Sequence, residues 1–158
     1  MKTLIIGLGN PILGDDGVGW RVAEEVKQRL PSSPREGDVQ VECFALGGLS
    51  LMEQMTGYKR VILIDSIYTG TKPVGTVSLL PLADLPDLTS GHTTAAHDTS
   101  LRNALNVGRS MDIPLPKDED VLVVAIEAEA VYDFSEKLSP PVEAAVSVAV
   151  EAVQKLID

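Results

Sequence analysis

Residues 4–19 read LIIGLGNPILGDDGVG, an apolar run that leads into a glycine-rich turn and then into the start of a helix. A β-branched apolar run that is closed by Gly and Pro predicts a buried strand ending in a turn. Apolar residues then recur four apart from Val18 to Leu30, which predicts an amphipathic helix over residues 17–30. A buried strand followed at once by a helix is typical of an α/β fold.

The same alternation continues along the rest of the chain. Strands are predicted over residues 39–43, 61–64, 76–80 and 121–125, and helices over residues 49–55, from just after His97 to Met111, and over 141–157. Segment 76–80 is expected at an edge of the sheet, antiparallel to its neighbour. Segment 82–94 is rich in Pro, Gly, Ser and Thr and is expected to be a long loop. The pattern predicts one α/β domain over residues 1–158, a three-layer α/β/α sandwich with a mostly parallel sheet and helices on both faces.

The composition excludes several classes of protein. The chain has 158 residues and a formal net charge of −10, so it would repel the phosphate backbone of a nucleic acid. A single cysteine, Cys43, excludes an intramolecular disulfide framework. No apolar run is long enough to be a signal segment or to span a membrane. We therefore expect a soluble, cytoplasmic protein with neither nucleic acid nor membrane as a partner.

The turn after the first strand resembles two phosphate-binding loops and matches neither. The third glycine of a G-x-G-x-x-G fingerprint would fall at Ile12. Gly9 and Gly14 fit the spacing G-x-x-x-x-G, but Asp15 and Asp16 stand where a phosphate loop has Lys and Ser or Thr. Two carboxylates would repel a triphosphate, so a nucleotide site is rejected.

Candidate functional residues cluster where parallel sheets bind their ligands, beyond the carboxyl ends of the strands. Asp15 and Asp16 can each be a helix cap or a ligand. A carboxylate that directly follows four buried aliphatic residues, as Asp65 does, is costly unless it is paired, hydrogen-bonded or metal-bound. His97 precedes a predicted helix and can point into the same cleft. Two carboxylates and one imidazole suit nickel or zinc and leave coordination positions open for a substrate.

Other catalytic devices are not supported by the sequence. Cys43 alternates with polar residues inside a predicted strand and is expected to be a small core residue. The chain has neither a G-x-S-x-G nucleophile elbow nor an H-E-x-x-H helix. His92, the second histidine, lies in the Thr-rich segment and is expected to be a dispensable surface residue.

Four segments stand out, in this order, over nearly the whole chain: Gly7-Leu8-Gly9-Asn10 with Asp15-Asp16-Gly17-Val18-Gly19, Gly47-Gly48 with Leu49 to Met55 and Val61-Ile62-Leu63-Ile64-Asp65, His97-Asp98-Thr99-Ser100-Leu101, and Leu138-Ser139-Pro140. Together they resemble the signature segments of the hydrogenase maturation endopeptidases. The resemblance implies an α/β/α fold with a five-stranded twisted sheet. It also implies an endopeptidase, aspartic-type or metal-dependent, that removes the C-terminal extension of the nickel-iron hydrogenase large-subunit precursor after nickel insertion.

Carried over by motif, the resemblance implies that Asp16, Asp65 and His97 contact the nickel and form the catalytic site. The substrate carries this nickel, and no tightly bound cofactor of the enzyme itself is expected. Two positions depart from the family pattern, because many members have Glu where this chain has Asp16, and Ala where it has Ser66. Two alternatives stay open: a zinc hydrolase with its own metal at the same three residues, and a nickel-binding maturation chaperone that does not cut.

Overall fold

A computed structural model describes residues 2–30, 38–84, 93–129 and 134–158, and of residues 93–100 it describes the backbone alone. The strands are β1 (Thr3–Leu8), β2 (Val39–Phe44), β3 (Arg60–Ile67), β4 (Val77–Pro81) and β5 (Val121–Glu127). The α-helices are α1 (Val18–Arg29), α2 (Gly48–Gln54), α3 (Thr93–Ser110) and α4 (Pro140–Ile157). The described residues also form the short 3-10 turns η1 (Gly14–Gly17), η3 (Leu82–Asp84) and η4 (Asp118–Asp120).

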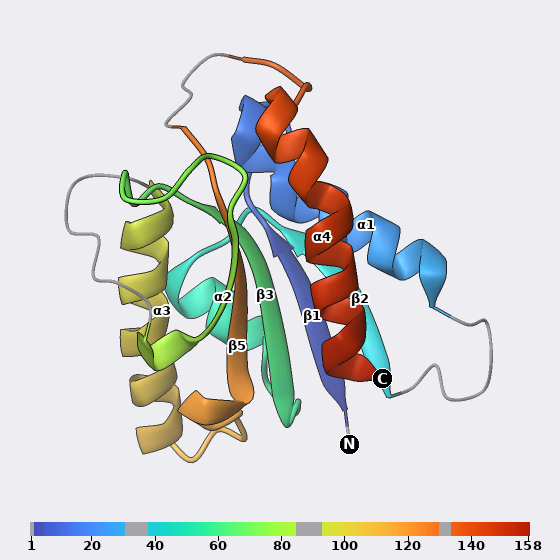
Figure 1. Cartoon of the computed structure of the whole chain (residues 1–158). Coiled ribbons are helices and arrows are strands. Elements are labelled where there is room, and N and C mark those ends of the chain that lie inside the picture. Colours follow the sequence, from blue (N-terminus) through green and yellow to red (C-terminus); the bar gives the residue numbers. More distant parts are fainter. Residues whose placement is uncertain (1, 31–37, 85–92, 130–133) are drawn as a thin grey trace.

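The strands form one five-stranded sheet in the order β2-β1-β3-β5-β4 (Figure 1). The pairs β1–β2, β1–β3 and β3–β5 are parallel, and β4 pairs antiparallel with β5 at an edge. This arrangement confirms the predicted mostly parallel sheet and the predicted antiparallel edge strand. The continuous apolar run of β3 fits its central place, because a central parallel strand is buried on both faces.

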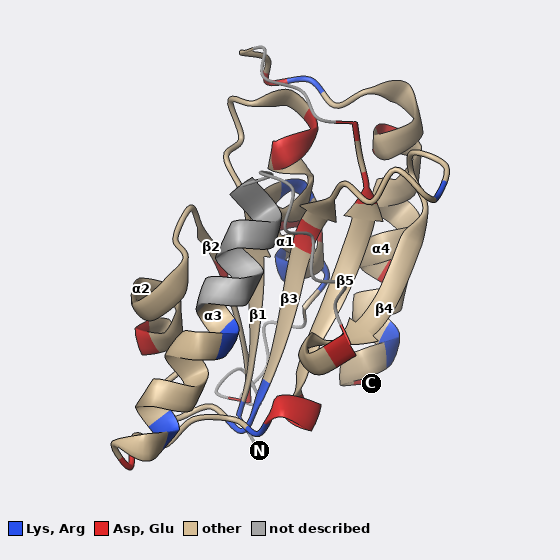
Figure 2. Cartoon of the chain, turned by 90° about the vertical axis from the view of Figure 1, so that its left-hand side faces the viewer, with Lys and Arg blue, Asp and Glu red and all other residues tan. Residues whose placement is uncertain are grey.

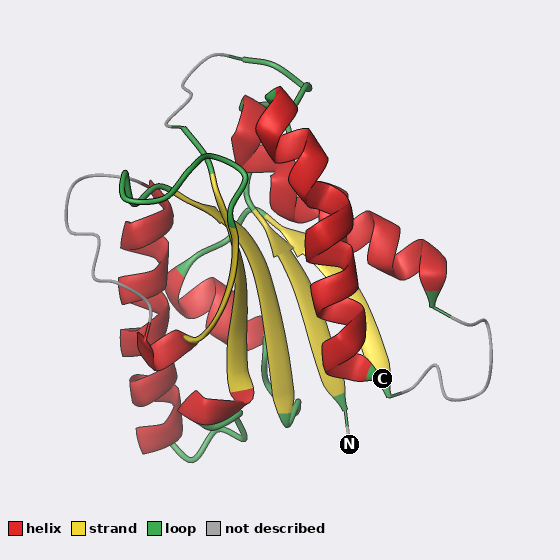
Figure 3. Ribbon diagram, viewed as in Figure 1, coloured by secondary structure: helices red, strands yellow, loops and turns green. Residues whose placement is uncertain are grey.

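Helices cover both faces of the sheet, with α2 and α3 on one side and α1 and α4 on the other (Figures 1 and 3). Successive side chains of β3 alternate between the two cores. Val61, Leu63 and Ile67 pack in the core beneath α2 and α3, whereas Ile62 and Ile64 pack in the core beneath α1 and α4. The three-layer α/β/α sandwich predicted from the sequence is confirmed. None of the helices within the described ranges has the length and apolar composition needed to cross a membrane.

Helix α1 lies directly against the backbone of β1, and glycines make this approach possible. A Cβ atom at Gly7 would come within 2.5 Å of the carbonyl oxygen of Gly19. A Cβ atom at Gly19 would overlap the carbonyl oxygens of Leu8 and Ile64. Because the helix starts so close to the sheet, the turn η1 before it contacts β3.

The central strand is longer than its apolar run predicts. Asp65 was expected after the end of the strand, but β3 continues to Ile67. The extra residues remain in the ladder with β5, where Asp65 pairs with Ala125 and Ile67 pairs with Glu127. Asp65 therefore lies inside a strand, held by hydrogen-bonded neighbours on a rigid element.

The boundaries of the predicted loop before His97 also differ from the prediction. Helix α3 begins at Thr93, so His97 lies within the helix and does not precede it. Leu82–Asp84 form the turn η3 at the start of the segment expected to be a loop. The rest of that segment up to the helix, residues 85–92, lies outside the described residues, and His92 with it.

Candidate active site

Asp16 is presented by the turn that joins β1 to α1. Gly9 adopts φ of 130°, and a Cβ atom there would overlap the carbonyl oxygen of Asp16, so only glycine fits this position without rearrangement. The carboxylate accepts two hydrogen bonds: the backbone N of Asn10 donates to Oδ2 at 2.8 Å, and Oγ of Ser66 donates to Oδ1 at 3.3 Å. These donors fix the orientation of a half-buried carboxylate at the carboxyl end of the parallel strands.

Asp65 is a nearly fully buried carboxylate, 5 % exposed, inside β3. By the alternation of the strand, its side chain points to the face that α2 and α3 cover, as those of Leu63 and Ile67 do. Acidic residues lie near the arrowheads of β3 and β5 in Figure 2. Since burial of a carboxylate is costly, retention of Asp65 in this place requires compensating polar contacts or a functional role.

His97 lies in the first half of α3, the helix on the same face of the sheet as the Asp65 side chain. Its own side chain is outside the described part of the structure. Leu101 and Leu105 of the same helix are fully buried in the core that contains Leu63. The packing of α3 therefore brings the backbone of His97 to the face of the sheet to which Asp65 points, and the predicted meeting of the two side chains stays a prediction.

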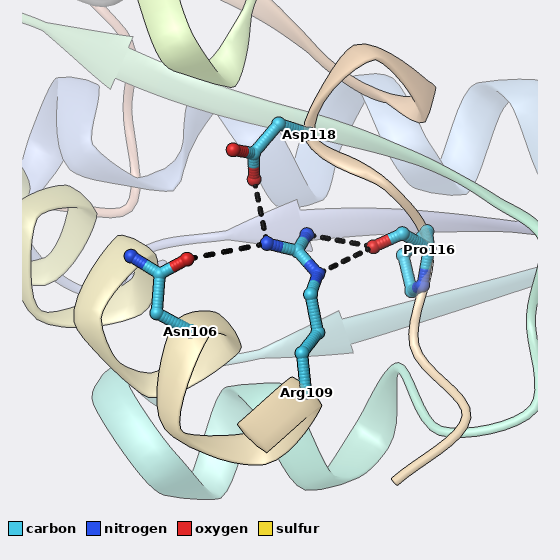
Figure 4. A network of polar contacts seen from close by, with 4 residues as sticks. All are labelled: Asn106, Arg109, Pro116 and Asp118. Carbon is cyan, nitrogen blue, oxygen red and sulfur yellow. Dashed lines mark hydrogen bonds and ion pairs between the residues drawn. The ribbon is translucent and has the colours of Figure 1, made fainter. Parts of the chain in front are cut away.

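Arg109 anchors the C-terminal end of α3 through polar contacts (Figure 4). Its guanidinium donates to the carbonyl oxygen of Pro116 from Nη2 at 2.7 Å and from Nε at 3.2 Å. It also forms an ion pair with Asp118 at 2.8 Å and a longer contact with Asn106 at 3.4 Å. These contacts tie the last turn of α3 to the segment that enters β5, so the helix is anchored to the same strand that flanks Asp65.

The three predicted site residues are thus distributed over neighbouring elements. Asp16 is hydrogen-bonded to Ser66, the residue next to Asp65, which ties the turn η1 to β3. Ser66 and Asp65 point to opposite faces of the strand. Asp16 therefore reaches the end of the sheet from the side of α1, while Asp65 and the helix of His97 occupy the side of α3.

Asp15 has a different role from Asp16. It is 2 % exposed and accepts two hydrogen bonds from Ser139, at 2.7 Å from the backbone N and at 2.8 Å from Oγ. Ser139 is the N-cap residue of α4. The interpretation of Asp15 and Asp16 as caps of α1 is wrong, because the N-cap of α1 is Gly17 and makes no side-chain cap bond. Asp15 instead joins the site-bearing turn to the start of the last helix.

A further buried carboxylate, Glu127, was not singled out from the sequence. It is the last residue of β5, is 2 % exposed, and pairs in the ladder with Ile67. The backbone N of Thr69 donates to its Oε2 at 2.7 Å, and the Thr69 hydroxyl donates to its Oε1. A pocket of about 180 Å³ opens beside it. Its sequence signal is the one used for Asp65, an acid that ends a run of buried aliphatic residues.

Cys43 is no candidate nucleophile. Its side chain packs against the core beneath α1 and α4, as predicted. Burial, together with the nearby carboxylates of Glu24 and Glu42, raises the pKa of the thiol to about 11, although Lys27 acts in the opposite direction. The thiolate is the reactive form of cysteine, so this environment suppresses its reactivity near neutral pH.

The carboxylate of Asp16 keeps unused acceptor positions. An ionised carboxylate has about four lone-pair sites. The two hydrogen bonds at Asp16 therefore leave sites free for a metal. Among the side chains that the structure describes, which exclude that of His97, no three acidic, histidine or cysteine residues lie close enough together to hold a metal ion. A histidine or a ligand from a substrate would have to complete the set.

Comparison with known proteins gives a consistent result. The sequence model of a family described as hydrogenase maturation protease matches residues 20–156. The chain is 27 % identical to the hydrogenase 2 maturation protease of Escherichia coli, over 97 % of this chain and 88 % of that protein.

Solved structures give the same match at the level of the fold. The structure of the hydrogenase maturating endopeptidase of E. coli superposes with a TM-score of 0.77 at 27 % identity, over 99 % of this chain and 92 % of that one. A [NiFe] hydrogenase maturation protease from Thermococcus kodakarensis superposes with a TM-score of 0.74 over the full length of both chains, and at 24 % identity it supports the fold alone.

Proposed function

The chain belongs to the hydrogenase maturation protease family, and we propose that it removes the C-terminal extension of a nickel-iron hydrogenase large-subunit precursor after nickel has been inserted. The reaction is hydrolysis of one peptide bond. Water adds to the carbonyl carbon, the carbon–nitrogen bond breaks, and the leaving amine takes a proton. We place this reaction in the cytoplasm, with the large-subunit precursor as the macromolecular partner.

One observation carries the assignment of the site. The hydrogen bond from Ser66 to Asp16 ties residues 7–19, the first segment that resembles the family, to the second such segment, because Ser66 directly follows Asp65. Two carboxylates from segments far apart in the sequence are thus presented at one end of the sheet, where open α/β sheets bind their ligands. We propose that His97, from α3, completes the set with an imidazole.

The proposed role of this set is to detect nickel that the substrate already holds. Two carboxylates and one imidazole leave coordination positions open and bind a divalent ion weakly by themselves. The affinity rises when the ligands of the substrate share the ion, because the metal then bridges two proteins. Cleavage would consequently follow metal loading, and an unfinished precursor would be left intact.

A paired measurement tests this function. The metal content of the purified enzyme is determined first. Nickel-loaded and nickel-free precursors are then incubated separately with the enzyme, and the mass of each product is measured by mass spectrometry. We expect little metal in the resting enzyme and shortening of the nickel-loaded precursor alone. His97→Ala should abolish the cleavage, whereas His92→Ala, a matched change in the neighbouring segment, should leave it nearly intact.

Other outcomes would support the two alternatives. Stoichiometric zinc in the resting enzyme, with equal cleavage of both precursors, would indicate a zinc hydrolase with its own metal at Asp16, Asp65 and His97. Binding of the nickel-loaded precursor without any shortening would indicate a maturation chaperone. Either result would refute the nickel-dependent endopeptidase.

A further inference from the structure

A pocket of about 180 Å³ lies next to Asp65 and has no part in the function proposed so far. Two of its lining residues fix its position. Ala125 pairs directly with Asp65 in the ladder between β3 and β5, and Ile67 lies two residues beyond Asp65 on the same face of β3. The backbones of neighbouring strands are about 4.8 Å apart, and the Cα atoms of residues two apart in one strand are about 6.6 Å apart. The pocket is therefore lined by neighbours of Asp65 on the same face of the sheet, although Asp65 itself does not line it.

The floor of the pocket is apolar. Ile67, Ala125 and Leu80 line it, and Leu80 packs against the same core as the residues beneath α2 and α3. An apolar floor gains free energy when it is covered by another apolar group, by roughly 25 cal/mol per Å² of area removed from water. The floor thus favours a hydrocarbon ligand.

The charged groups of the pocket each have a hydrogen-bond partner within the protein. Both carboxylate oxygens of Glu127 accept hydrogen bonds from Thr69. Thr71 donates in turn to the Thr69 hydroxyl, from its backbone N at 3.1 Å and from its own hydroxyl at 2.9 Å. The Lys72 ammonium donates to Ser78 Oγ at 3.0 Å on the β4 side. Glu127 and Lys72 carry formal charges of opposite sign, so a charged ligand that one of them attracts is repelled by the other, whereas an uncharged ligand is repelled by neither.

We propose that this pocket binds one uncharged aliphatic side chain of the substrate, from a residue close to the bond that is cut. The volume suits such a group, since a cavity of about 150 Å³ lined by aliphatic and aromatic side chains holds one benzene molecule. The position beside Asp65 places that side chain next to the candidate site. This inference rests on the proposed function, because it assigns a specificity pocket to the same proteolytic reaction.

The first test changes only the substrate. The cleavage point is determined by mass spectrometry, and the residues on both sides of it are replaced one at a time by Ala, Leu, Lys and Asp. We expect a single position at which Leu is cleaved best, at which Ala lowers kcat/KM by about tenfold, and at which Lys and Asp lower it further. Equal cleavage of all variants at every position would overturn the pocket assignment.

The second test blocks the pocket. Ser78 lines it from β4, whereas Leu79, the next residue, faces the other way and is 48 % exposed. Ser78→Phe should lower kcat/KM for the aliphatic substrate by at least about tenfold and should remove the preference at the sensitive position. Leu79→Phe adds a ring to the same strand outside the pocket and should change neither. Thermal melts identify a variant that is not folded, and Ser78→Leu then replaces Ser78→Phe.

The outcomes separate the two levels of inference. If the unmodified enzyme cleaves the nickel-loaded precursor but Ser78→Phe retains both full activity and the side-chain preference, the proteolytic function stands and the pocket assignment is wrong. If the unmodified enzyme cleaves no precursor, the proposed function fails, and the specificity role of the pocket fails with it.

Discussion

Replacing Asp15 by Ala should destabilise the protein far more than any change at an exposed carboxylate. The substitution leaves the backbone N–H of Ser139 without its acceptor and removes the partner of the Ser139 hydroxyl. A hydrogen bond to a charged group contributes about 1.5–3 kcal/mol, and part of this is offset because the buried carboxylate no longer has to be desolvated. We expect the free energy of unfolding to fall by about 3 kcal/mol, a loss of roughly 6–12 °C in Tm for a domain of this size.

The assay is urea unfolding followed by circular dichroism, with a double-mutant cycle that pairs Asp15→Ala with Ser139→Ala. Because the two residues share the same contact, their effects should not add. Glu143→Ala is the control: Glu143 of α4 pairs with Arg21 of α1 at 2.8 Å, but both side chains are about half exposed, so we expect a loss of about 0–1 kcal/mol. A loss at Asp15→Ala no larger than at Glu143→Ala would refute the argument that the buried contact joins the turn to α4.

The remaining predictions concern the site and the thiol. Asp16→Asn and Asp65→Asn should each abolish precursor cleavage, measured by mass spectrometry, while the circular dichroism spectrum stays that of the folded protein; normal cleavage by both variants would show that the carboxylates are not part of the site. Ser66→Ala removes the donor to Asp16 Oδ1 at 3.3 Å and should lower kcat by a few-fold without loss of the fold, and an unchanged kcat would show that this bond does not orient the carboxylate. The folded Cys43 thiol holds its proton up to a pKa of about 11, above the ordinary value of 9.0, so at pH 8 iodoacetamide should alkylate the native protein much more slowly than the urea-unfolded chain. Because the pKa of Cys43 is higher in the folded protein than its ordinary value, its contribution to the free energy of unfolding is present below about pH 9 and is lost as the pH rises through about 11.

The periodicity of the sequence predicts most of the fold, because the amphipathic pattern and the burial have the same physical cause. The apolar residues of α4 that recur on one face are the ones that are buried, among them Val142, Val146 and Val150. The end of β3 is less predictable. Asp65 and Ser66 interrupt the apolar run, and the strand continues past them only because β5 supplies pairing partners. Local pattern does not contain that information.

The site shows the same division between local and tertiary information. Asp15 and Asp16 are adjacent and chemically identical, and only their partners, Ser139 and Asn10 with Ser66, distinguish a structural carboxylate from a candidate ligand. Glu127 could have been found, since it ends a buried run as Asp65 does. The predicted metal contacts of Asp16, Asp65 and His97 stay a prediction, because they require a second molecule.

The strand order also affects how the chain can fold while it is being made. β5 lies between β3 and β4 in the sheet but is synthesised after both. On the ribosome, β4 therefore emerges before β5, the strand with which it pairs. The apolar face of β3 that carries Ile62 and Ile64 also waits for α4, the last helix, to complete its cover. A nascent chain that pauses before β5 would expose this surface, and such exposed edges and faces are where chaperones bind and aggregation begins.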